Sequence, residues 1–227
     1  IEPLTFNYLK RIIEIEKPDA VLPTLGGQTA LNLSMELEQN DVLKENNVVL
    51  LGASANAIEI AENRWKFKEA MDSVGIKTLK ATYAKTFEEG MNASTEIGFP
   101  LMLRPSFILG GGGTSVVNNE EDFQSKLNDA FNASPTQEVL IEESIYGWKE
   151  FELEVMRDSD GNGVIVCGIE NFDPMGIHTG DSITVAPIQT LSDKEYQIMR
   201  DEALLCLDTI GIATGGSNVQ FAINPEN

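Results

Sequence analysis

An arginine and a run of glycines form the first stretch of this chain that could do chemistry. Arg104 stands in a strand-like run at residues 101–105, and four consecutive glycines follow at residues 110–113. Glycine tolerates positive φ, and its N–H groups can close around an anion, so the stretch predicts phosphate binding. Residues 114–117 (TSVV) are β-branched and lack the Lys-Ser/Thr of a P-loop. We therefore predict a glycine flap at a hairpin tip lying over a nucleotide; an ordinary surface hairpin is the alternative.

Carboxylates alternate along a second strand-like segment. In residues 149–157, Glu150, Glu152 and Glu154 share one face, and apolar side chains share the other. Three carboxylates in a row on an open face repel one another, so we expect cations or ribose hydroxyls on that face. A solvated edge strand is the alternative interpretation.

Two further segments carry side chains suited to ligands. Residues 217–223 alternate so that Asn218 and Gln220 share a face, and amide oxygens can bind magnesium when carboxylates stand beside them. His178 is the only histidine and lies in an irregular stretch, residues 171–182, that is rich in oxygen donors. Such a loop can fold around an ion or a phosphate, and its histidine can make a catalytic contact; a structural histidine is the alternative.

The elements that must position these residues are of mixed type. We expect a helix at residues 4–17, a strand at 20–23, a glycine turn at 24–28, a helix at 29–39 and a strand at 48–52. This is the order of a parallel α/β unit. Its glycines do not match a dinucleotide fingerprint, so we assign them a structural role. Connecting helices are expected at residues 55–63, with Ser54 as the N-cap, and at residues 65–74. This section contains the basic cluster Arg64, Lys66 and Lys68, whose default interpretation is a solvated face.

The remaining elements predict two small lobes around the flap. Strands are expected at residues 79–83, 101–105, 115–118 and 139–143, with helices at residues 87–97 and 121–132. The chain continues with strands at residues 149–157, 164–170 and 217–223. Ser192 is expected to cap a helix at residues 193–210. Residues 158–163 form a hairpin turn and not a calcium loop, because the glutamate at the twelfth loop position is missing.

The overall composition limits the possible partners. The chain has 227 residues, with 16 basic against 36 acidic side chains and a net charge of −20, which disfavours nucleic acid and anionic membranes. Cys167 and Cys206 show no metal or redox spacing, and the sequence has no signal peptide or membrane span. We therefore expect a cytoplasmic protein. Both ends, at Ile1 and Asn227, look cut, so we expect a fragment of a longer chain.

Four motifs in this sequence indicate a resemblance to a known protein family. They read PTLGGQTALN at residues 23–32, RPSF at 104–107, GIHTGDSITVAP at 176–187 and GGSNVQF at 215–221. Together they resemble the carbamoyl phosphate synthetase large chain, in its first, carboxyphosphate-forming half, within the ATP-grasp superfamily. The resemblance implies a fold that is α/β and α+β: a partial Rossmann-like pre-ATP-grasp domain at residues 1–52, connecting helices at 53–75, an ATP-grasp N-lobe with the flap at 76–145, and a truncated C-lobe at 146–227.

The resemblance also implies a reaction. The family uses MgATP to phosphorylate bicarbonate to carboxyphosphate, which ammonia converts to carbamate on the way to carbamoyl phosphate for arginine and pyrimidine synthesis. The implied cofactors are ATP, Mg²⁺ or Mn²⁺, and K⁺. The implied partners are bicarbonate, a glutamine amidotransferase small subunit or domain, and the remainder of the large chain. Phosphoryl transfer needs positioning and charge neutralisation more than covalent chemistry, which suits these residues.

Site residues follow from the same resemblance. Those implied at the nucleotide are Arg64 and Arg104 on the phosphates, the backbone of Gly110 and Gly111 in the flap, Glu143 and Ile145 at adenine, and Glu150 on the ribose. Those implied near the reacting groups are Gly176, Ile177 and His178 along the phosphates and bicarbonate, with His178 and Arg104 orienting bicarbonate, and Gln220 as a metal ligand. Potassium is implied near Glu150, Asn171, Asp173 and Ser182.

The flap departs from the family pattern, because Gly112 replaces a hydroxyl residue and Thr114 and Ser115 replace later positions. The family's next strand carries further metal ligands, so we expect this chain by itself to fold but to bind MgATP weakly and not to turn over. A biotin-carboxylase-like ATP-grasp enzyme is one alternative. A non-catalytic nucleotide-sensing or structural α/β module is the other.

Overall fold

The computed structural model describes residues 2–106, 114–177, 181–212 and 215–225. The chain divides into two compact units. The larger unit comprises residues 1–77, 149–173 and 177–223, and the smaller unit comprises residues 78–148, 174–176 and 224–227. Both units combine helices with a sheet, so the predicted mixture of α/β and α+β structure is confirmed.

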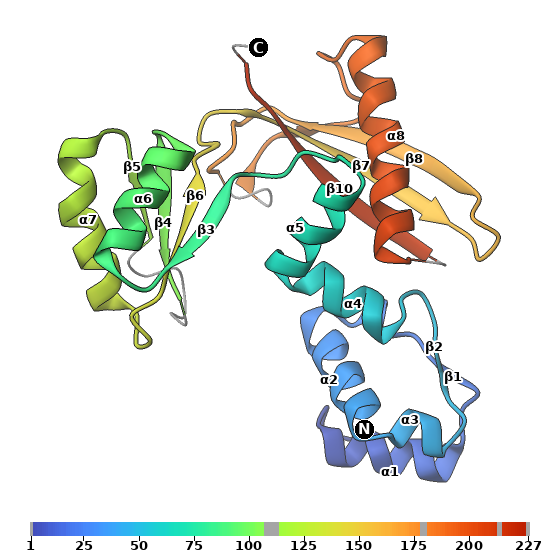
Figure 1. The fold of residues 1–227 in the computed structure, drawn as a ribbon. Coiled ribbons are helices and arrows are strands. Elements are labelled where there is room, and N and C mark those ends of the chain that lie inside the picture. Colours follow the sequence, from blue (N-terminus) through green and yellow to red (C-terminus); the bar gives the residue numbers. More distant parts are fainter. Residues whose placement is uncertain (1, 107–113, 178–180, 213–214, 226–227) are drawn as a thin grey trace. The chain divides into compact units, whose positions relative to one another are not determined.

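The smaller unit is a four-stranded antiparallel sheet with two helices on one face (Figure 1). The strands are β3 (Ala81–Ala84), β6 (Val139–Glu143), β4 (Leu101–Pro105) and β5 (Ser115–Val117), in that spatial order. The helices are α6 (Phe87–Ile97) and α7 (Glu120–Ala133). Because strand side chains alternate, Leu101 and Leu103 point into the helix-covered core while Met102 and Arg104 lie on the other face.

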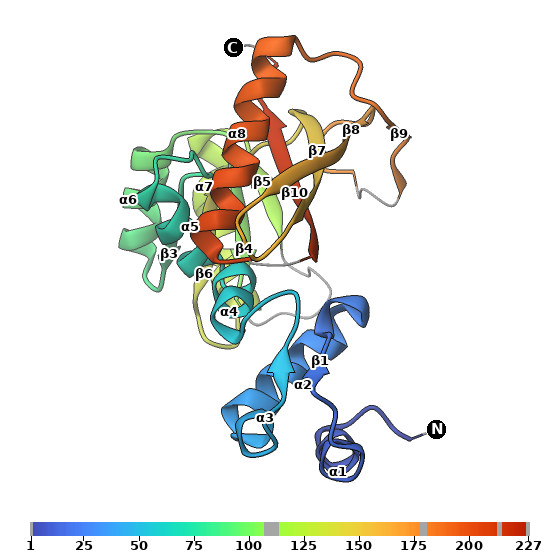
Figure 2. The ribbon, with the colours of Figure 1, turned by 90° about the vertical axis from the view of Figure 1, so that its right-hand side faces the viewer.

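A second antiparallel sheet lies in the larger unit, with strands β10 (Gly215–Ile223), β7 (Lys149–Arg157), β8 (Gly163–Asn171) and β9 (Thr184–Val185) in that order. Helix α8 (Asp193–Ile210) crosses one face of it (Figure 2). Phe151, Leu153 and Val155 of β7 are fully or almost fully buried beneath this helix. The predicted cap is present: the Ser192 hydroxyl accepts a hydrogen bond from the Glu195 N–H, and Glu195 returns the contact.

The amino-terminal part of the larger unit is helical around a short parallel ladder. Its elements are α1 (Phe6–Glu16), β1 (Ala20–Val21), the 3₁₀ helix η1 (Pro23–Leu25), α2 (Gly27–Gln39), α3 (Val42–Glu45), β2 (Val49–Leu50), α4 (Ala55–Glu62) and α5 (Arg64–Ser73). β1 and β2 pair in parallel, which confirms the predicted α/β unit. Helices α4, α5 and α8 share a core cluster of Ala57, Met71, Cys206 and Ile210.

Several predicted boundaries were wrong at the short elements. Pro23, expected at the end of a strand, begins η1 instead, because the fixed φ of proline suits the first position of a helix. The sequence did not predict α3, which is only 4 residues long, or the 2-residue strand β9. Periodicity needs more residues than these elements contain. Among the described residues, no helix is long and apolar enough to cross a membrane.

Candidate functional site

The carboxylate strand is not an edge strand. β7 pairs with β10 on one side and β8 on the other, and Glu150 and Glu152 are only 4% and 7% exposed. The alternative of a solvated edge strand is therefore wrong. The prediction that the carboxylates share one face is confirmed, since the residues between them fill the core under α8. A buried carboxylate needs hydrogen-bond donors or a cation, so its neighbours decide the chemistry of this face.

Amide side chains from both neighbouring strands contact these carboxylates. The Asn171 Nδ2 donates to Glu152 Oε1 at 2.8 Å. The Asn218 Nδ2 donates to Glu152 Oε2 and to Glu154 Oε1, each at 2.8 Å. Gln220 lies directly opposite Glu152 in the β10–β7 register and so shares this face. We expected cations or ribose hydroxyls on this face and did not predict these amide donors.

Two of the residues implied for potassium, Glu150 and Asn171, lie on neighbouring strands of the larger unit, and the other two, Asp173 and Ser182, lie between β8 and β9. Glu150 is the register partner of Asn171, and Asn171 is in turn the partner of Thr184. The Phe172 N–H donates to the Ile183 carbonyl at 2.9 Å. The backbone therefore brings residues 171–173 alongside residues 182–184.

Two oxygen atoms at this place have no partner within the described part of the chain. Asn171 Oδ1 and Ser182 Oγ are buried and accept no hydrogen bond from any described residue. Asp173 Oδ2 accepts a hydrogen bond from the Ile183 N–H at 3.1 Å. Buried polar atoms are almost always satisfied in native proteins, so the two orphaned oxygens suit an oxygen-seeking cation.

Glu170 fastens the following segment to the sheet. It is 6% exposed and accepts hydrogen bonds from the Gln189 N–H at 2.9 Å, the Thr190 N–H at 3.0 Å and the Thr190 hydroxyl at 2.5 Å. Burial by itself raises the pKa of this carboxyl, but the three hydrogen bonds together with the charge of Lys149 outweigh burial, and the net pKa is lowered. Glu170 therefore stays ionised and holds residues 189–190 against β8.

In the smaller unit, the segment after β6 meets residues 174–176. The Gly147 N–H donates to the Met175 carbonyl at 2.9 Å, and the Met175 N–H donates to the Trp148 carbonyl at 2.8 Å. Gly176 has a φ of +110°, and a Cβ at this position would lie 2.4 Å from Cδ2 of Tyr146. Only glycine fits there, on grounds of both backbone conformation and space.

The two residues predicted to contact adenine, Glu143 and Ile145, lie beside this segment. The Glu143 N–H donates to the Lys80 carbonyl at 2.8 Å, and the Ile145 carbonyl accepts from the Trp148 N–H at 3.0 Å. The structure thus brings Glu143, Ile145 and Gly176 into the smaller unit together.

Arg104 projects from β4 on the face opposite the helices. Its Nε donates to Glu142 Oε2 on β6 at 2.6 Å, with the Arg104 side chain 43% exposed and that of Glu142 11% exposed. This carboxylate orients the guanidinium and leaves part of it accessible to a ligand. Our sequence analysis assigned no role to Glu142.

The other predicted residues fall in different places. Arg64 is the first residue of α5 in the larger unit, and Ile177, 41% exposed, follows Gly176. Gly110, Gly111 and His178 lie outside the described residues. Among the described residues, no cluster of three or more histidine, cysteine, aspartate and glutamate side chains could hold a metal ion.

The fold resembles that of biotin carboxylases. Biotin carboxylase from Campylobacter jejuni, in a beta-gamma-ATP complex, matches with a TM-score of 0.74 and 22% identity over 98% of this chain and 50% of its own. The biotin carboxylase domain of a Hydrogenobacter thermophilus 2-oxoglutarate carboxylase, in complex with MgADP, ADP and bicarbonate, gives a TM-score of 0.73 and 20% identity over 100% of this chain and 50% of its own. At such identities the likeness shows the fold alone, which is that of a biotin carboxylase domain.

Sequence comparison is more specific. Residues 63–227 match the carbamoyl-phosphate synthase L chain ATP-binding domain, and residues 1–60 match the carbamoyl phosphate synthase preATP-grasp domain. The chain therefore belongs to the carbamoyl-phosphate synthase large chain family. A large chain from Pasteurella multocida is 57% identical over 227 residues, and a large chain, N-terminal section, from Aquifex aeolicus is 56% identical over the same length. This chain spans 21% of the first relative and 41% of the second.

Proposed function

We propose that this chain is part of a carbamoyl phosphate synthase large chain and takes part in the ATP-dependent phosphorylation of bicarbonate to carboxyphosphate. Ammonia would displace phosphate from carboxyphosphate to give carbamate, and carbamate would lead to carbamoyl phosphate for arginine and pyrimidine synthesis. The observation that carries the proposal is the identity of 54–57% over essentially the whole chain with proteins of that name, including one called the N-terminal section.

Arginine side chains and backbone N–H groups would bind the phosphates of the nucleotide. Arg104 and Arg64 would contact the phosphates, with the backbone of Gly110 and Gly111. A guanidinium that is already oriented, as Arg104 is by Glu142, loses less entropy when it binds a phosphate.

Adenine would lie along Glu143 and Ile145, and the ribose would contact Glu150. Among the described residues, the Ile145 N–H has no acceptor, and a free backbone donor of this kind is what a purine ring nitrogen would use. Burial of Glu150 within the sheet favours its use as a fixed acceptor for a hydroxyl.

Bicarbonate is a poor nucleophile, so its orientation matters. His178 and Arg104 would hold it, and Gly176 and Ile177 would line the phosphates beside it. Gln220 would ligate a Mg²⁺ or Mn²⁺ ion, which neutralises charge on the transferred phosphoryl group. The position of Gln220 opposite Glu152 supports this role, because hard cations prefer several oxygens on one face.

Potassium fits the residues near the end of β8. Glu150, Asn171, Asp173 and Ser182 would hold it, and the orphaned oxygens of Asn171 and Ser182 support the assignment. Replacing Ser182 with alanine is expected to raise the potassium concentration needed for half-maximal ATP hydrolysis. An unchanged potassium requirement would remove this ion from the proposal.

The proposed partners are a glutamine amidotransferase subunit or domain and the remainder of the large chain, and the proposed compartment is the cytoplasm. A reducing compartment suits Cys167 and Cys206, which are both free thiols.

Bicarbonate-dependent ATP hydrolysis tests the proposal. It should be measured in a large chain of the length of the curated relatives that carries this sequence. We expect ADP release to rise on adding bicarbonate and to fall sharply in the His178→Asn variant. ATP binding without any bicarbonate dependence would instead favour a nucleotide-sensing module. Bicarbonate-dependent hydrolysis that carboxylates biotin would favour a biotin-carboxylase-like enzyme.

A further inference from the structure

A series of hydrogen bonds crosses three strands of the larger unit, on the face of β7 that carries the carboxylates. The Asn218 amide on β10 donates to Glu154 Oε1 and to Glu152 Oε2, each at 2.8 Å. The Asn171 amide on β8 donates to Glu152 Oε1, also at 2.8 Å. Glu152 is therefore held from both neighbouring strands, and each of its two oxygens accepts a hydrogen bond.

Glu152 decides which way the Asn171 amide is turned. A carboxylate can only accept hydrogen bonds, so the NH₂ group of Asn171 must face Glu152, and the carbonyl oxygen Oδ1 must face away from it. The reversed amide would place two acceptors against each other. Glu152 is 7% exposed and Asn171 is 4% exposed, so bulk water cannot relieve a wrong orientation.

The amide oxygen that this contact turns away is one of the two orphaned oxygens. Asn171 Oδ1 accepts no hydrogen bond from any described residue, and neither does Ser182 Oγ. The Phe172 N–H donates to the Ile183 carbonyl at 2.9 Å, which brings the segments of these two residues alongside each other. A fixed and unsatisfied amide oxygen suits a hard cation, and potassium is the ion proposed for these residues.

Glu152 itself is less suited to contact the ion. Its register partner on β8 is Ile169, whereas Asn171 is the register partner of Glu150. Glu152 thus reaches Asn171 along the diagonal of the sheet, and amide donors already use both of its oxygens. The geometry therefore favours a role through Asn171 over direct binding of the ion.

We infer that Glu152 is a positioning residue for the proposed potassium site and that it acts through Asn171. The inference rests on the proposed function and deepens it. Hydrogen bonds from outer residues orient the ligands of metal ions, and the loss of such a contact lowers metal affinity about 10–100-fold. Without Glu152 the amide of Asn171 could turn, and its NH₂ group would then face the cation and repel it.

Three variants separate orientation from charge. Glu152→Gln removes the charge and offers one acceptor oxygen to the two amide donors, so one of them must turn or lose its partner. Glu154→Gln removes the same charge from the same face of β7, but it can still accept from Asn218 and leaves the contact of Asn171 with Glu152 unchanged.

The third variant, Glu152→Gln combined with Asn171→Asp, exchanges donor and acceptor. The glutamine NH₂ then faces the introduced carboxylate, and the glutamine oxygen accepts from Asn218. The second oxygen of the introduced carboxylate takes the place of Asn171 Oδ1. The pair keeps its net charge and its hydrogen bond, so this variant should restore an oxygen at the proposed site.

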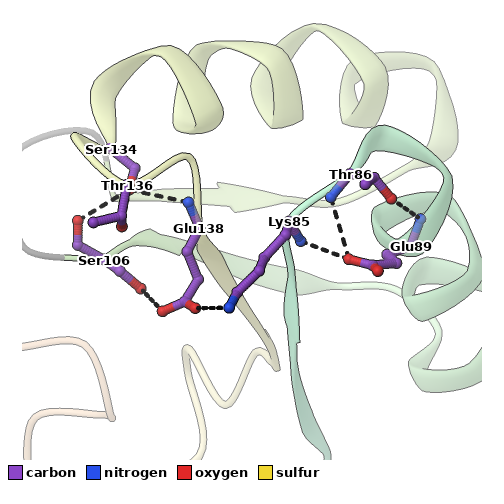
Figure 3. Close-up of polar contacts among 7 residues, drawn as sticks. All are labelled: Lys85, Thr86, Glu89, Ser106, Ser134, Thr136 and Glu138. Carbon is purple, nitrogen blue, oxygen red and sulfur yellow. Dashed lines mark hydrogen bonds and ion pairs between the residues drawn. The ribbon is translucent and has the colours of Figure 1, made fainter.

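A network in the smaller unit provides a matched control. Glu138 Oε1 accepts a hydrogen bond from the Ser106 hydroxyl at 2.9 Å, and Glu138 Oε2 pairs with Lys85 Nζ at 3.3 Å (Figure 3). Glu138→Gln is the same chemical change as Glu152→Gln, again at a hydrogen-bonded carboxylate. All four residues of the proposed potassium site belong to the larger unit, so this variant changes none of their contacts with Glu152.

The experiment measures hydrogen exchange by mass spectrometry in a large chain of the length of the curated relatives. Each variant is compared in potassium chloride and in tetramethylammonium chloride at equal ionic strength, without nucleotide, so the result does not depend on turnover. Peptides covering residues 169–173 and 181–185 report on the proposed site, and their protection against potassium concentration gives an apparent Kd. Bicarbonate-dependent ATP hydrolysis is then measured over the same potassium range.

Glu152→Gln should raise the apparent Kd for potassium about tenfold, and the potassium concentration for half-maximal ATP hydrolysis should rise with it. Glu154→Gln and Glu138→Gln should change the apparent Kd much less. The double variant should recover most of the affinity that Glu152→Gln loses, although it carries one substitution more.

Three results would overturn the inference. In the first, Glu152→Gln leaves the apparent Kd unchanged while the unsubstituted chain responds to potassium. In the second, Glu154→Gln or Glu138→Gln raises the Kd as much as Glu152→Gln, so that charge or stability and not orientation sets the affinity. In the third, the double variant is as impaired as Glu152→Gln. If neither exchange nor ATP hydrolysis responds to potassium in the unsubstituted chain, the proposed potassium site fails and the inference fails with it.

Discussion

Asn218 separates two carboxylates on the face of β7, and replacing it with aspartate would turn both contacts into repulsions. Its Nδ2 lies 2.8 Å from an oxygen of Glu152 and 2.8 Å from an oxygen of Glu154. Asn218→Asp keeps the size and shape of the side chain and changes only the donor to a charged acceptor. The variant therefore tests whether the amide is what makes this carboxylate face tolerable.

The size of the effect follows from the two contacts. Hydrogen bonds to charged groups contribute about 1.5–3 kcal/mol when buried, and since Asn218 is itself exposed we expect about 1–3 kcal/mol for the pair. Two like charges about 4 Å apart repel by about 4 kcal/mol at an effective dielectric constant of about 20. The repulsion energy cannot exceed the cost of protonating the new carboxyl, which at pH 7 is about 4 kcal/mol for a group of pKa about 3.9. Asn218→Asp should thus cost about 2–4 kcal/mol at pH 7.

The sign of the pH dependence distinguishes repulsion from simple loss of contacts. The neighbouring carboxylates raise the folded-state pKa of the introduced carboxyl above its unfolded value. Its protonated form carries no charge, so the repulsive part of the deficit is absent below the unfolded pKa and grows as pH rises through the folded pKa. Asn218→Ala loses the same donors without adding charge, so its deficit at pH 7.5 should be smaller than that of Asn218→Asp.

Hydrogen exchange followed by mass spectrometry is the suitable assay, because it resolves each unit. Protection factors of peptides from β7 and β10 should fall in Asn218→Asp at pH 7.5 and recover towards pH 4.5, while peptides from β4 and β6 of the smaller unit serve as an internal reference. Asn7→Asp, on the exposed side of α1, controls for the added charge. Unchanged protection of β10 at pH 7.5, or the same deficit at both pH values, would refute the reasoning.

Three further predictions concern single positions. Gly176→Ala should destabilise the smaller unit by more than Gly147→Ala does. Both variants force alanine into positive φ, at about 1–3 kcal/mol each, but only at Gly176 does a side chain lie 2.4 Å from the new Cβ. Equal melting temperatures of the two variants would contradict this. Burial raises the pKa of the Cys206 thiol to about 11, so thiol reagents at pH 8 should label Cys167 first. The free energy of unfolding should fall between pH 9 and 11, and it should fall less steeply in Cys206→Ala than in the unsubstituted chain. Ser54→Ala removes the acceptor of the Ala57 N–H and should cost about 1 kcal/mol in urea unfolding, whereas no loss would mean that water replaces the cap.

Local sequence signals determined most of the elements. The helix at residues 87–97 and the strands at residues 101–105, 139–143 and 149–157 have the predicted bounds, because capping residues and alternation are encoded within a few positions. Ser54 and Ser192 were predicted as caps for the same reason, and both accept the expected hydrogen bond. The family also followed from short motifs, and the matches over residues 1–60 and 63–227 agree with it.

Only the tertiary structure decided how the polar side chains are partnered. Glu150 and Glu152 read as exposed carboxylates in the sequence, but β7 is an inner strand and the amides of Asn171 and Asn218 come from strands on either side of it. Asn218 is 66 residues from Glu152 along the chain, and no local pattern reports a contact over that separation. Sequence determines which side chains share a face of one strand, whereas strand order determines which other strands meet that face, and strand order depends on the packing of the whole sheet.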